Sequence, residues 1–267
     1  MRPRNNSNKK PKDMTKIISI TNHKGGVGKS TTAACIGTLL ARYGKKTLLV
    51  DLDAQANLSK FFFSDQDFDN IESSIYESLV DETFKTPLPV LSVRPGLDLV
   101  PSSLSLAQID LRLAGRYTRE AILKRLLQPI ASNYDYVLLD CPPSLGILVV
   151  NAMAAATDIY IVTTAETMPY KGIGIIEDTA EIVKQNINKE LSISGIIITM
   201  WGNSKLFKVV EQSLREKYGD IVFRTKIRRA VAVPESQATS MGLIDYAPES
   251  TAAKDYISLT EEIIGRE

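Results

Sequence analysis

A glycine-rich segment with two lysines, residues 22–32, has the residue types and spacing that indicate chemistry most specifically. It reads Asn-His-Lys-Gly-Gly-Val-Gly-Lys-Ser-Thr-Thr, follows the apolar run 17–21 and precedes an Ala- and Leu-rich helical stretch. A strand, a glycine turn and a helix start in this order point backbone N–H groups and the positive end of a helix at an anion. The segment therefore predicts a phosphate-binding loop for a nucleoside triphosphate.

The two lysines of this loop are expected to differ in role. Lys29 is placed to curl back over the β and γ phosphates held by its own loop, whereas Lys24 needs another task. The generic pattern has a glycine five residues before Gly28, where this chain has His23, which we interpret as a loop-shaping residue. The residues expected to bind the nucleotide are Lys24, Gly25, Gly26, Val27, Gly28, Lys29, Ser30 and Thr31.

Acidic residues end two of the apolar, strand-like runs. Asp51 and Asp53 close the run that begins at residue 47, and Asp140 closes the run that begins at residue 134. Because ligands of parallel α/β sheets bind beyond the carboxyl ends of the strands, these acids should converge on the phosphates. We expect the Ser30 hydroxyl to ligate Mg²⁺, Asp140 to hold the ion through water, and Asp51 to help fix its shell.

Three motifs resemble those of the ParA/MinD family of ATPases, from about Lys16 to the C-terminus. Lys-Gly-Gly-Val-Gly-Lys-Ser resembles the family's deviant Walker A box, and residues 140–144 resemble its Asp-Ala-Pro-Pro-Ser. Residues 51–57 read Asp-Leu-Asp-Ala-Gln-Ala-Asn, where the family has proline and glycine in place of the alanines. The resemblance implies that Lys24 reaches the nucleotide of a partner subunit and that Asp53 orients the attacking water. Lys24, Lys29 and Asp53 are thus the expected catalytic residues.

The pattern of apolar runs predicts an α/β fold, a doubly wound, mostly parallel sheet with helices on both faces. The chain has 267 residues, 44% of them hydrophobic, which suits one domain over residues 14–267. Basic residues 1–13, rich in Pro, Asn and Ser, are expected to be a disordered tail. Strand-like runs recur at 17–21, 47–51, 97–100, 134–140, 158–163 and 194–200, and Gly44 is expected to cap the helix after the loop.

Several functional classes lack support in the composition. No apolar stretch approaches the roughly 18 residues of a membrane span, and no secretion signal is recognisable, so we expect a cytoplasmic protein. Cys35 and Cys141 are too few for a disulfide framework or a zinc site and are expected to pack in the core.

Charge is distributed unevenly along the second half of the chain. The whole chain carries +1, but residues 205–229 carry eight basic and three acidic residues, and residues 230–267 carry two and seven. A solvated surface is the usual explanation of a basic run, but the family resemblance favours nonspecific contact with DNA phosphates. In an extended chain, Arg224, Lys226 and Arg228 would share one face. The expected DNA-binding residues are Lys205, Lys208, Arg224, Lys226, Arg228 and Arg229.

The base of the nucleotide is expected to be adenine. Residues 188–190 fail the motif with which GTP-binding relatives hold guanine. By resemblance, the adenine-contacting segment spans about 227–237, where Ile-Arg-Arg-Ala replaces the family's Ile-Pro-Arg-Asn. ATP and Mg²⁺ are therefore the expected cofactors.

The chain resembles ParA/Soj-type partition ATPases most. That resemblance implies an ATP-bound sandwich homodimer that binds DNA nonspecifically, associates with the nucleoid, and is stimulated by a ParB-like centromere-binding protein. A membrane-cycling MinD-like ATPase would end in a basic amphipathic helix. Here the last helix has mostly acidic polar positions and should pack on the core through Tyr256, Leu259, Ile263 and Ile264. A biosynthetic P-loop phosphotransferase remains the alternative from a different class.

Overall fold

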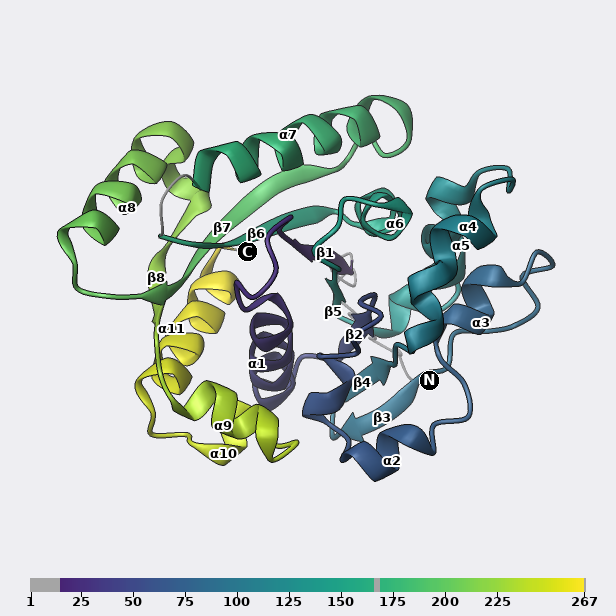
Figure 1. Ribbon diagram of the computed structural model, residues 1–267, viewed down its shortest axis with the longest axis horizontal. Helices are drawn as coiled ribbons and strands as arrows, with labels where there is room; N and C mark the ends of the chain where they lie inside the picture. The colour runs from purple at the N-terminus through teal and green to yellow at the C-terminus, as the bar shows by residue number, and fades with distance from the viewer. Residues whose placement is uncertain (1–14, 166–168, 267) are drawn as a thin grey trace, which may run out of the picture.

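A single twisted sheet organises the protein (Figure 1). The computed structural model describes residues 15–165 and 169–266. In these residues the sheet has eight strands in the order β3-β4-β2-β5-β1-β6-β7-β8. The strands are β1 (Lys16–Thr21), β2 (Thr47–Asp51), β3 (Leu91–Arg94), β4 (Leu97–Val100), β5 (Tyr136–Asp140), β6 (Asp158–Thr164), β7 (Ser192–Trp201) and β8 (Val222–Arg228).

The strand order places the phosphate-binding loop at the centre of the sheet. All neighbouring strands pair in parallel except β3, which is antiparallel to β4. From β1 the chain crosses to β2 on one side, while β6 pairs with β1 on the other side. Ligands of open α/β sheets bind where the winding reverses, beyond the carboxyl ends of the strands. The loop after β1 lies at this point.

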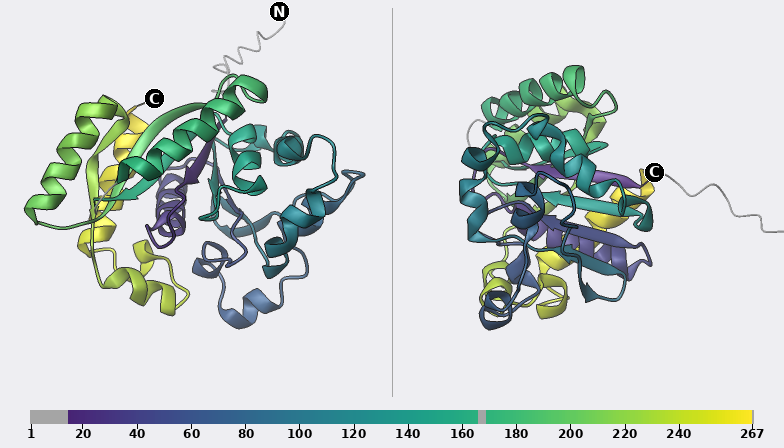
Figure 2. Two further views of the ribbon diagram at one scale, coloured as in Figure 1. Left: turned by 45° about the horizontal axis from the view of Figure 1, so that its top comes forward. Right: turned by 90° about the vertical axis from the view of Figure 1, so that its right-hand side faces the viewer.

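Helices cover both faces of the sheet (Figure 2). Along β5, Val137 and Leu139 join the apolar cluster on one face, and Tyr136 and Leu138 join the cluster on the other. One layer of helices consists of α1 (Lys29–Arg42), α9 (Ala232–Ala238), α10 (Leu243–Tyr246) and α11 (Thr251–Gly265). The opposite layer consists of α3 (Ile75–Val80), α4 (Ile109–Leu113), α5 (Ile122–Leu127), α6 (Ile147–Ala155), α7 (Pro169–Asn186) and α8 (Lys205–Tyr218).

The predicted fold class and the predicted strands are confirmed, with boundaries that differ by at most two residues. Gly44 has φ +78° after α1, as expected of a left-handed helix cap. Two strands were not predicted. β3 has only four residues and a polar, half-exposed pattern, and β8 has cations at alternate positions where a core strand would have apolar residues. Both are edge strands, which need less apolar surface than central ones.

The predicted tail of residues 1–13 lies outside the described residues. The short helix α2 (Asp65–Asp69) packs beside a single-turn 3₁₀ helix, Ser59–Phe61. α11 buries Tyr256, Leu259 and Ile263 against β8 and α1, which confirms the expected packing of the last helix. Over the described ranges, none of the helices is both long and apolar enough to cross a bilayer.

Candidate functional site

The loop between β1 and α1 is held by hydrogen bonds from neighbouring strands. The Asn22 Nδ2 donates to the Val162 carbonyl over 2.6 Å, and the Asn22 Oδ1 accepts from the Lys24 N–H over 2.9 Å. The Thr199 hydroxyl donates to the Val27 carbonyl over 2.7 Å. Gly28, with φ +89°, has a left-handed backbone that a side chain would strain. These contacts fix the backbone of the loop that the sequence predicts to bind phosphate.

Lys29 begins α1 inside this cradle. Its side chain is buried, and its ammonium donates to the Lys24 carbonyl over 3.3 Å, so it folds back along its own loop as expected. Burial lowers the pKa of Lys29, while Asp140, Cys141 and Asp53 oppose that shift. A buried ammonium gains most from an added anion, because its desolvation is then compensated by a direct charge contact.

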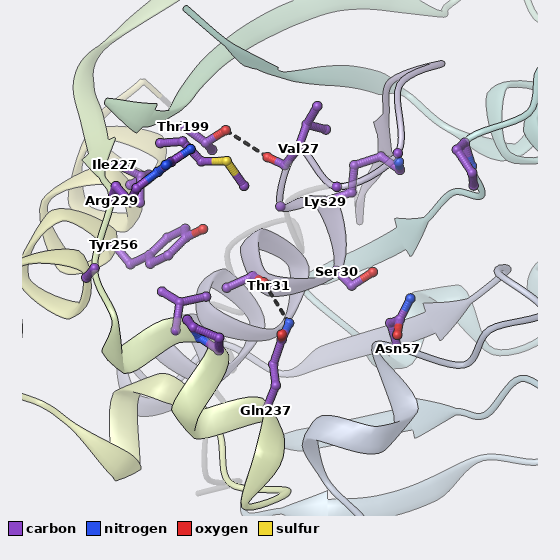
Figure 3. A pocket seen from close by; sticks show the side chains of 18 of the residues that line it. Val27, Lys29, Ser30, Thr31, Asn57, Thr199, Ile227, Arg229, Gln237 and Tyr256 are labelled. Carbon is purple, nitrogen blue, oxygen red and sulfur yellow. Dashed lines mark hydrogen bonds between the residues drawn. The ribbon is translucent and has the colours of Figure 1, made fainter. Parts of the chain in front are cut away.

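A cavity of about 760 Å³ opens beside the loop (Figure 3). The loop and the first turn of α1 form one wall, and residues 227–237 form the facing wall. Thr199 of β7 and Tyr256 of α11 also line it, and the Gln237 amide donates to the Thr31 hydroxyl over 3.4 Å between the walls. The volume lies in the range of sites for nucleotide-sized ligands.

The wall distant from the phosphate loop is mostly apolar. A purine needs such a surface to cover its faces, with a few polar groups at its edge. The apolar residues of this wall are Ile227, Ala230, Val231, Val233 and Pro234. The segment proposed by resemblance for adenine contact therefore does line the cavity, and the contact itself stays a prediction.

Asp51 and Asp140 are the last residues of the adjacent strands β2 and β5. Their Cα atoms are partners in the register of β2 and β5, and both side chains are fully buried. Asp51 accepts from Ser59 over 2.7 and 2.8 Å and from the Asp53 N–H over 3.1 Å. Neither carboxylate oxygen of Asp140 has a hydrogen-bond partner among the described residues.

The environment of the Asp140 carboxylate indicates whether a cation fits beside it. Burial raises the pKa of Asp140 well above its usual value, and Asp51 adds to the shift, while Ser30 and Lys29 oppose it. A buried carboxylate that lacks a well-formed hydrogen bond is costly unless a cation or a bound water compensates it. Oxygen ligands of this kind suit Mg²⁺. Ser30 and Asp140 therefore fit a magnesium site, whereas the hydrogen bonds of Asp51 favour a structural part for it.

Asp53 reaches the cavity from a tight turn. Its carboxylate accepts from the Gln55 N–H over 3.0 Å, and Asp53, Gln55 and Asn57 all line the cavity. Ala56 has φ +54°, the left-handed conformation that a glycine adopts easily. The turn thus keeps the geometry expected of the family's glycine, although alanine occupies the position. The role of Asp53 toward water remains a prediction.

The cysteines and His23 take the structural positions that the sequence suggests. Cys35 and Cys141 are free and buried, and burial raises the pKa of Cys141 to about 12. His23 is exposed, and its ring packs against Gly172 of α7, where a Cβ atom would collide with it. These contacts are consistent with packing and loop shaping.

The basic block is only partly available to a ligand. Lys205, Lys208 and Arg224 are exposed. The side chains of Lys226 and Arg228 instead reach helices on opposite faces of the sheet: Lys226 pairs with Glu211 of α8 over 2.9 Å, and Arg228 with Asp255 of α11 over 2.6 Å. The expectation that Arg224, Lys226 and Arg228 share one face is therefore wrong for Lys226 and Arg228. It failed because long side chains on an edge strand can turn toward acids on either side.

Arg228 and Arg229 both line the cavity. The Arg229 side chain lies beside Thr199 in Figure 3, and the Arg229 N–H donates to the Trp201 carbonyl over 3.2 Å. The residues that sequence reasoning missed at the cavity come from distant elements: Thr199, Met200, Tyr256 and Pro143. Of these, only Pro143 lies in a motif that the sequence analysis singled out.

Sequence comparisons find relatives over nearly the whole chain. The AAA domain family model matches residues 15–193. The sporulation initiation inhibitor protein Soj of Bacillus subtilis is 35% identical, with 94% of this chain and 98% of that protein covered. The chromosome partitioning protein ParA of Myxococcus xanthus is also 35% identical, with 94% and 89% covered.

Solved structures show the same fold. Cobyrinic acid a,c-diamide synthase from Mycobacterium smegmatis, with bound ADP and magnesium, superimposes with a TM-score of 0.80 at 30% identity, over 94% of both chains. A plasmid partition protein from Borrelia burgdorferi, bound to AMPPNP, gives 0.81 at 26% identity, over 95% of this chain and all of that chain. Together with the phosphate loop, the paired aspartates and the cavity, these similarities show that this chain belongs to the ParA/Soj family of partition ATPases.

Proposed function

We propose that this protein is a Mg²⁺-dependent ATPase that partitions DNA by dimerising on ATP, binding DNA nonspecifically as a dimer, and leaving the DNA after hydrolysis. The observation that carries this proposal is the pair of lysines in one loop. Lys29 is buried and folded back along its own loop, whereas Lys24 is exposed. An exposed cation in this loop can reach the nucleotide of a facing subunit.

The residues around the cradle supply the groups that phosphoryl transfer needs. ATP occupies the cavity with its phosphates against residues 25–31, and Ser30 and Asp140 hold Mg²⁺, which neutralises charge on the phosphates when bound. Lys29 and the partner's copy of Lys24 place positive charge around the transferred phosphoryl. Asp53 orients the attacking water.

DNA binding is assigned to the exposed cations of the second half of the chain. Lys205, Lys208 and Arg224 have accessible side chains, and Arg228 becomes available where a phosphate displaces Asp255. Contacts of this kind read the backbone rather than the bases, so the affinity falls steeply with salt. A ParB-like protein stimulates turnover. The protein acts at the nucleoid in the cytoplasm.

The experiment is retention on DNA of arbitrary sequence, compared with ADP, ATP and a non-hydrolysable ATP analogue across a salt series. We expect retention with ATP and more with the analogue, little with ADP, and loss as salt rises. Equal retention in all three nucleotide states contradicts the proposal. A small-molecule product formed in proportion to ADP would instead favour a biosynthetic activity, such as that named for the Mycobacterium smegmatis structural relative.

A further inference from the structure

Two buried serines outside the family signature, Ser59 and Ser102, hold the acidic turn after β2. Ser59 donates from its N–H and its hydroxyl to one oxygen of Asp51, over 2.8 and 2.7 Å. The Ser102 hydroxyl donates to the carbonyl of Asp53 over 2.5 Å, and the Ser102 N–H donates to the Ser59 hydroxyl over 3.2 Å. The two serines and the two aspartates thus form one connected network.

The sheet explains why this network can exist. β2 and β4 are neighbours, with Val50 opposite Val100, so Ser102 emerges beside the turn that follows β2. Ser59 and Ser102 are 0% and 2% exposed. Burying a hydroxyl costs free energy unless it is hydrogen-bonded, and both hydroxyls donate to the turn.

The backbone of the turn is strained, and the hydrogen bonds of the two serines hold it in this conformation. Ala56 has φ +54°, a conformation that costs a non-glycine residue free energy and persists where surrounding contacts fix it. The Ala56 N–H donates over 2.8 Å to the Asp53 carbonyl, the same oxygen that accepts from Ser102. Two donors on one carbonyl hold the peptide plane after Asp53 in a single orientation.

That orientation decides what faces the nucleotide. Asp53, Gln55 and Asn57 all line the cavity, and they follow one another along this turn. The Asp53 carboxylate accepts from the Gln55 N–H over 3.0 Å, so a change in the turn backbone after Asp53 would move this donor together with the side chains of Gln55 and Asn57, and would release the Asp53 carboxylate. A shift of the order of 1 Å at a reacting centre can lower a rate by about 100-fold.

We infer that Ser102 is a positioning residue for ATP hydrolysis, acting through the Asp53 carbonyl to aim the Asp53 carboxylate at the γ-phosphate end of the cavity. Ser59 anchors the start of the same turn through Asp51. This inference rests on the proposed function, in which Asp53 orients the attacking water.

The test compares Ser102→Ala with Ser78→Ala in the full-length protein. Ser78 is an equally buried serine whose hydroxyl donates to the Pro87 carbonyl over 2.7 Å, and it does not line the cavity. The readouts are kcat, the Kd of a fluorescent ATP analogue in Mg²⁺, and Tm. We expect Ser102→Ala to lower kcat by about 10- to 100-fold, with Kd changed by less than about 3-fold, and Ser78→Ala to leave kcat unchanged.

A double-mutant cycle separates positioning from a general structural effect. In an Asp53→Ala background, Ser102→Ala should have no further effect on the residual rate, because the group that it positions is absent. Should Ser102→Ala not fold, Ser102→Cys keeps the shape of the side chain with a larger atom and a weaker donor, and should also lower kcat.

The outcomes distinguish the inference from the function on which it rests. Wild-type kcat in Ser102→Ala, an equal loss in Ser78→Ala, or a further loss in the Asp53→Ala background overturns the role of Ser102. Absence of ATP hydrolysis by the wild-type protein overturns the proposed function instead.

Discussion

Asp51 and Asp140 face each other in register on the parallel strands β2 and β5, both fully buried. Burial raises the pKa of both, that of Asp51 to about 6, although hydrogen bonds from Ser59 and Asp53 oppose the shift at Asp51. Two adjacent carboxyl groups are not easily ionised together without a cation. The arrangement therefore lowers stability in the absence of ligand and favours binding of Mg²⁺ with the nucleotide.

Asp140→Asn should stabilise the nucleotide-free protein and abolish Mg²⁺-dependent hydrolysis. Asparagine has the same shape but no charge, so the repulsion with Asp51 is removed. We predict a free energy of unfolding higher by about 1 to 3 kcal/mol at neutral pH, measured by urea denaturation. A destabilised variant that still hydrolyses ATP at the wild-type rate would contradict this account of the acid pair.

The same pair predicts a pH dependence. The pKa of Asp51 rises from 3.8 to about 6 on folding, so between these values the folded state binds more protons than the unfolded state. The stability that protonation of Asp51 contributes is therefore present at low pH and is lost as pH rises through about 4 to 6. We expect the wild-type protein to lose stability relative to Asp51→Asn over this interval in denaturation measured without nucleotide. A parallel pH profile for the two proteins would disprove the assignment.

Asp255→Asn should increase affinity for DNA. The Asp255 carboxylate accepts from the Nε, the Nη2 and the backbone N–H of Arg228, so Asp255 competes with a DNA phosphate for the Arg228 side chain. We predict binding tighter by about 3- to 10-fold, measured by fluorescence anisotropy with the non-hydrolysable ATP analogue. Glu249→Gln, which breaks the exposed pair with Lys254, removes an equal charge and serves as control. An equal gain in both variants would mean that only net charge matters.

Gly195→Ala should destabilise the fold beside β8. A Cβ there would lie 2.6 Å from the rings of both Phe223 and Tyr160, which pack edge to face with centroids 5.3 Å apart. We predict a loss of about 1 to 3 kcal/mol in the free energy of unfolding. Gly174→Ala in α7 meets no atom within 4 Å and should be neutral or stabilising, because alanine favours helix. Equal stability of the two variants would contradict this prediction, because it would show that the rings of Phe223 and Tyr160 move to accommodate the added methyl group.

The phosphate loop could be predicted from sequence because its determinants are local. Residues 22–32 carry the strand end, the glycines and the helix start within one segment, and Asp51 and Asp140 follow from the rule that strand ends meet at one edge of the sheet. The fold class could be predicted for the same reason, because the alternation of apolar runs is also a local feature of the sequence.

The rest of the site depends on contacts between distant residues. Tyr256 reaches the cavity from the last helix, where its apolar spacing indicates only core packing, and Thr199 lies 172 residues from the Val27 carbonyl that it holds. Lys226 and Arg228 form a regular pattern in sequence, yet the acids that pair with them belong to two other helices. Periodicity shows which residues share a face, but it does not show which partner each side chain meets.

The two lysines of the loop should separate binding from association. Lys29→Ala removes the ammonium that lies in the cradle, so we predict loss of ATP binding by at least about 10-fold, measured with a fluorescent analogue. Lys24→Ala should retain ATP binding, because the cradle and Lys29 are intact. Wild-type affinity in Lys29→Ala would refute the assignment of the loop.

The most direct measurement is the mass of the protein in solution, by light scattering, with ADP and with a non-hydrolysable ATP analogue plus Mg²⁺. The proposed mechanism predicts a monomer with ADP, a doubling of mass with the analogue, and a monomer in both states for Lys24→Ala. A wild-type protein that remains monomeric with the analogue, or a Lys24→Ala variant that dimerises as the wild type does, would contradict it.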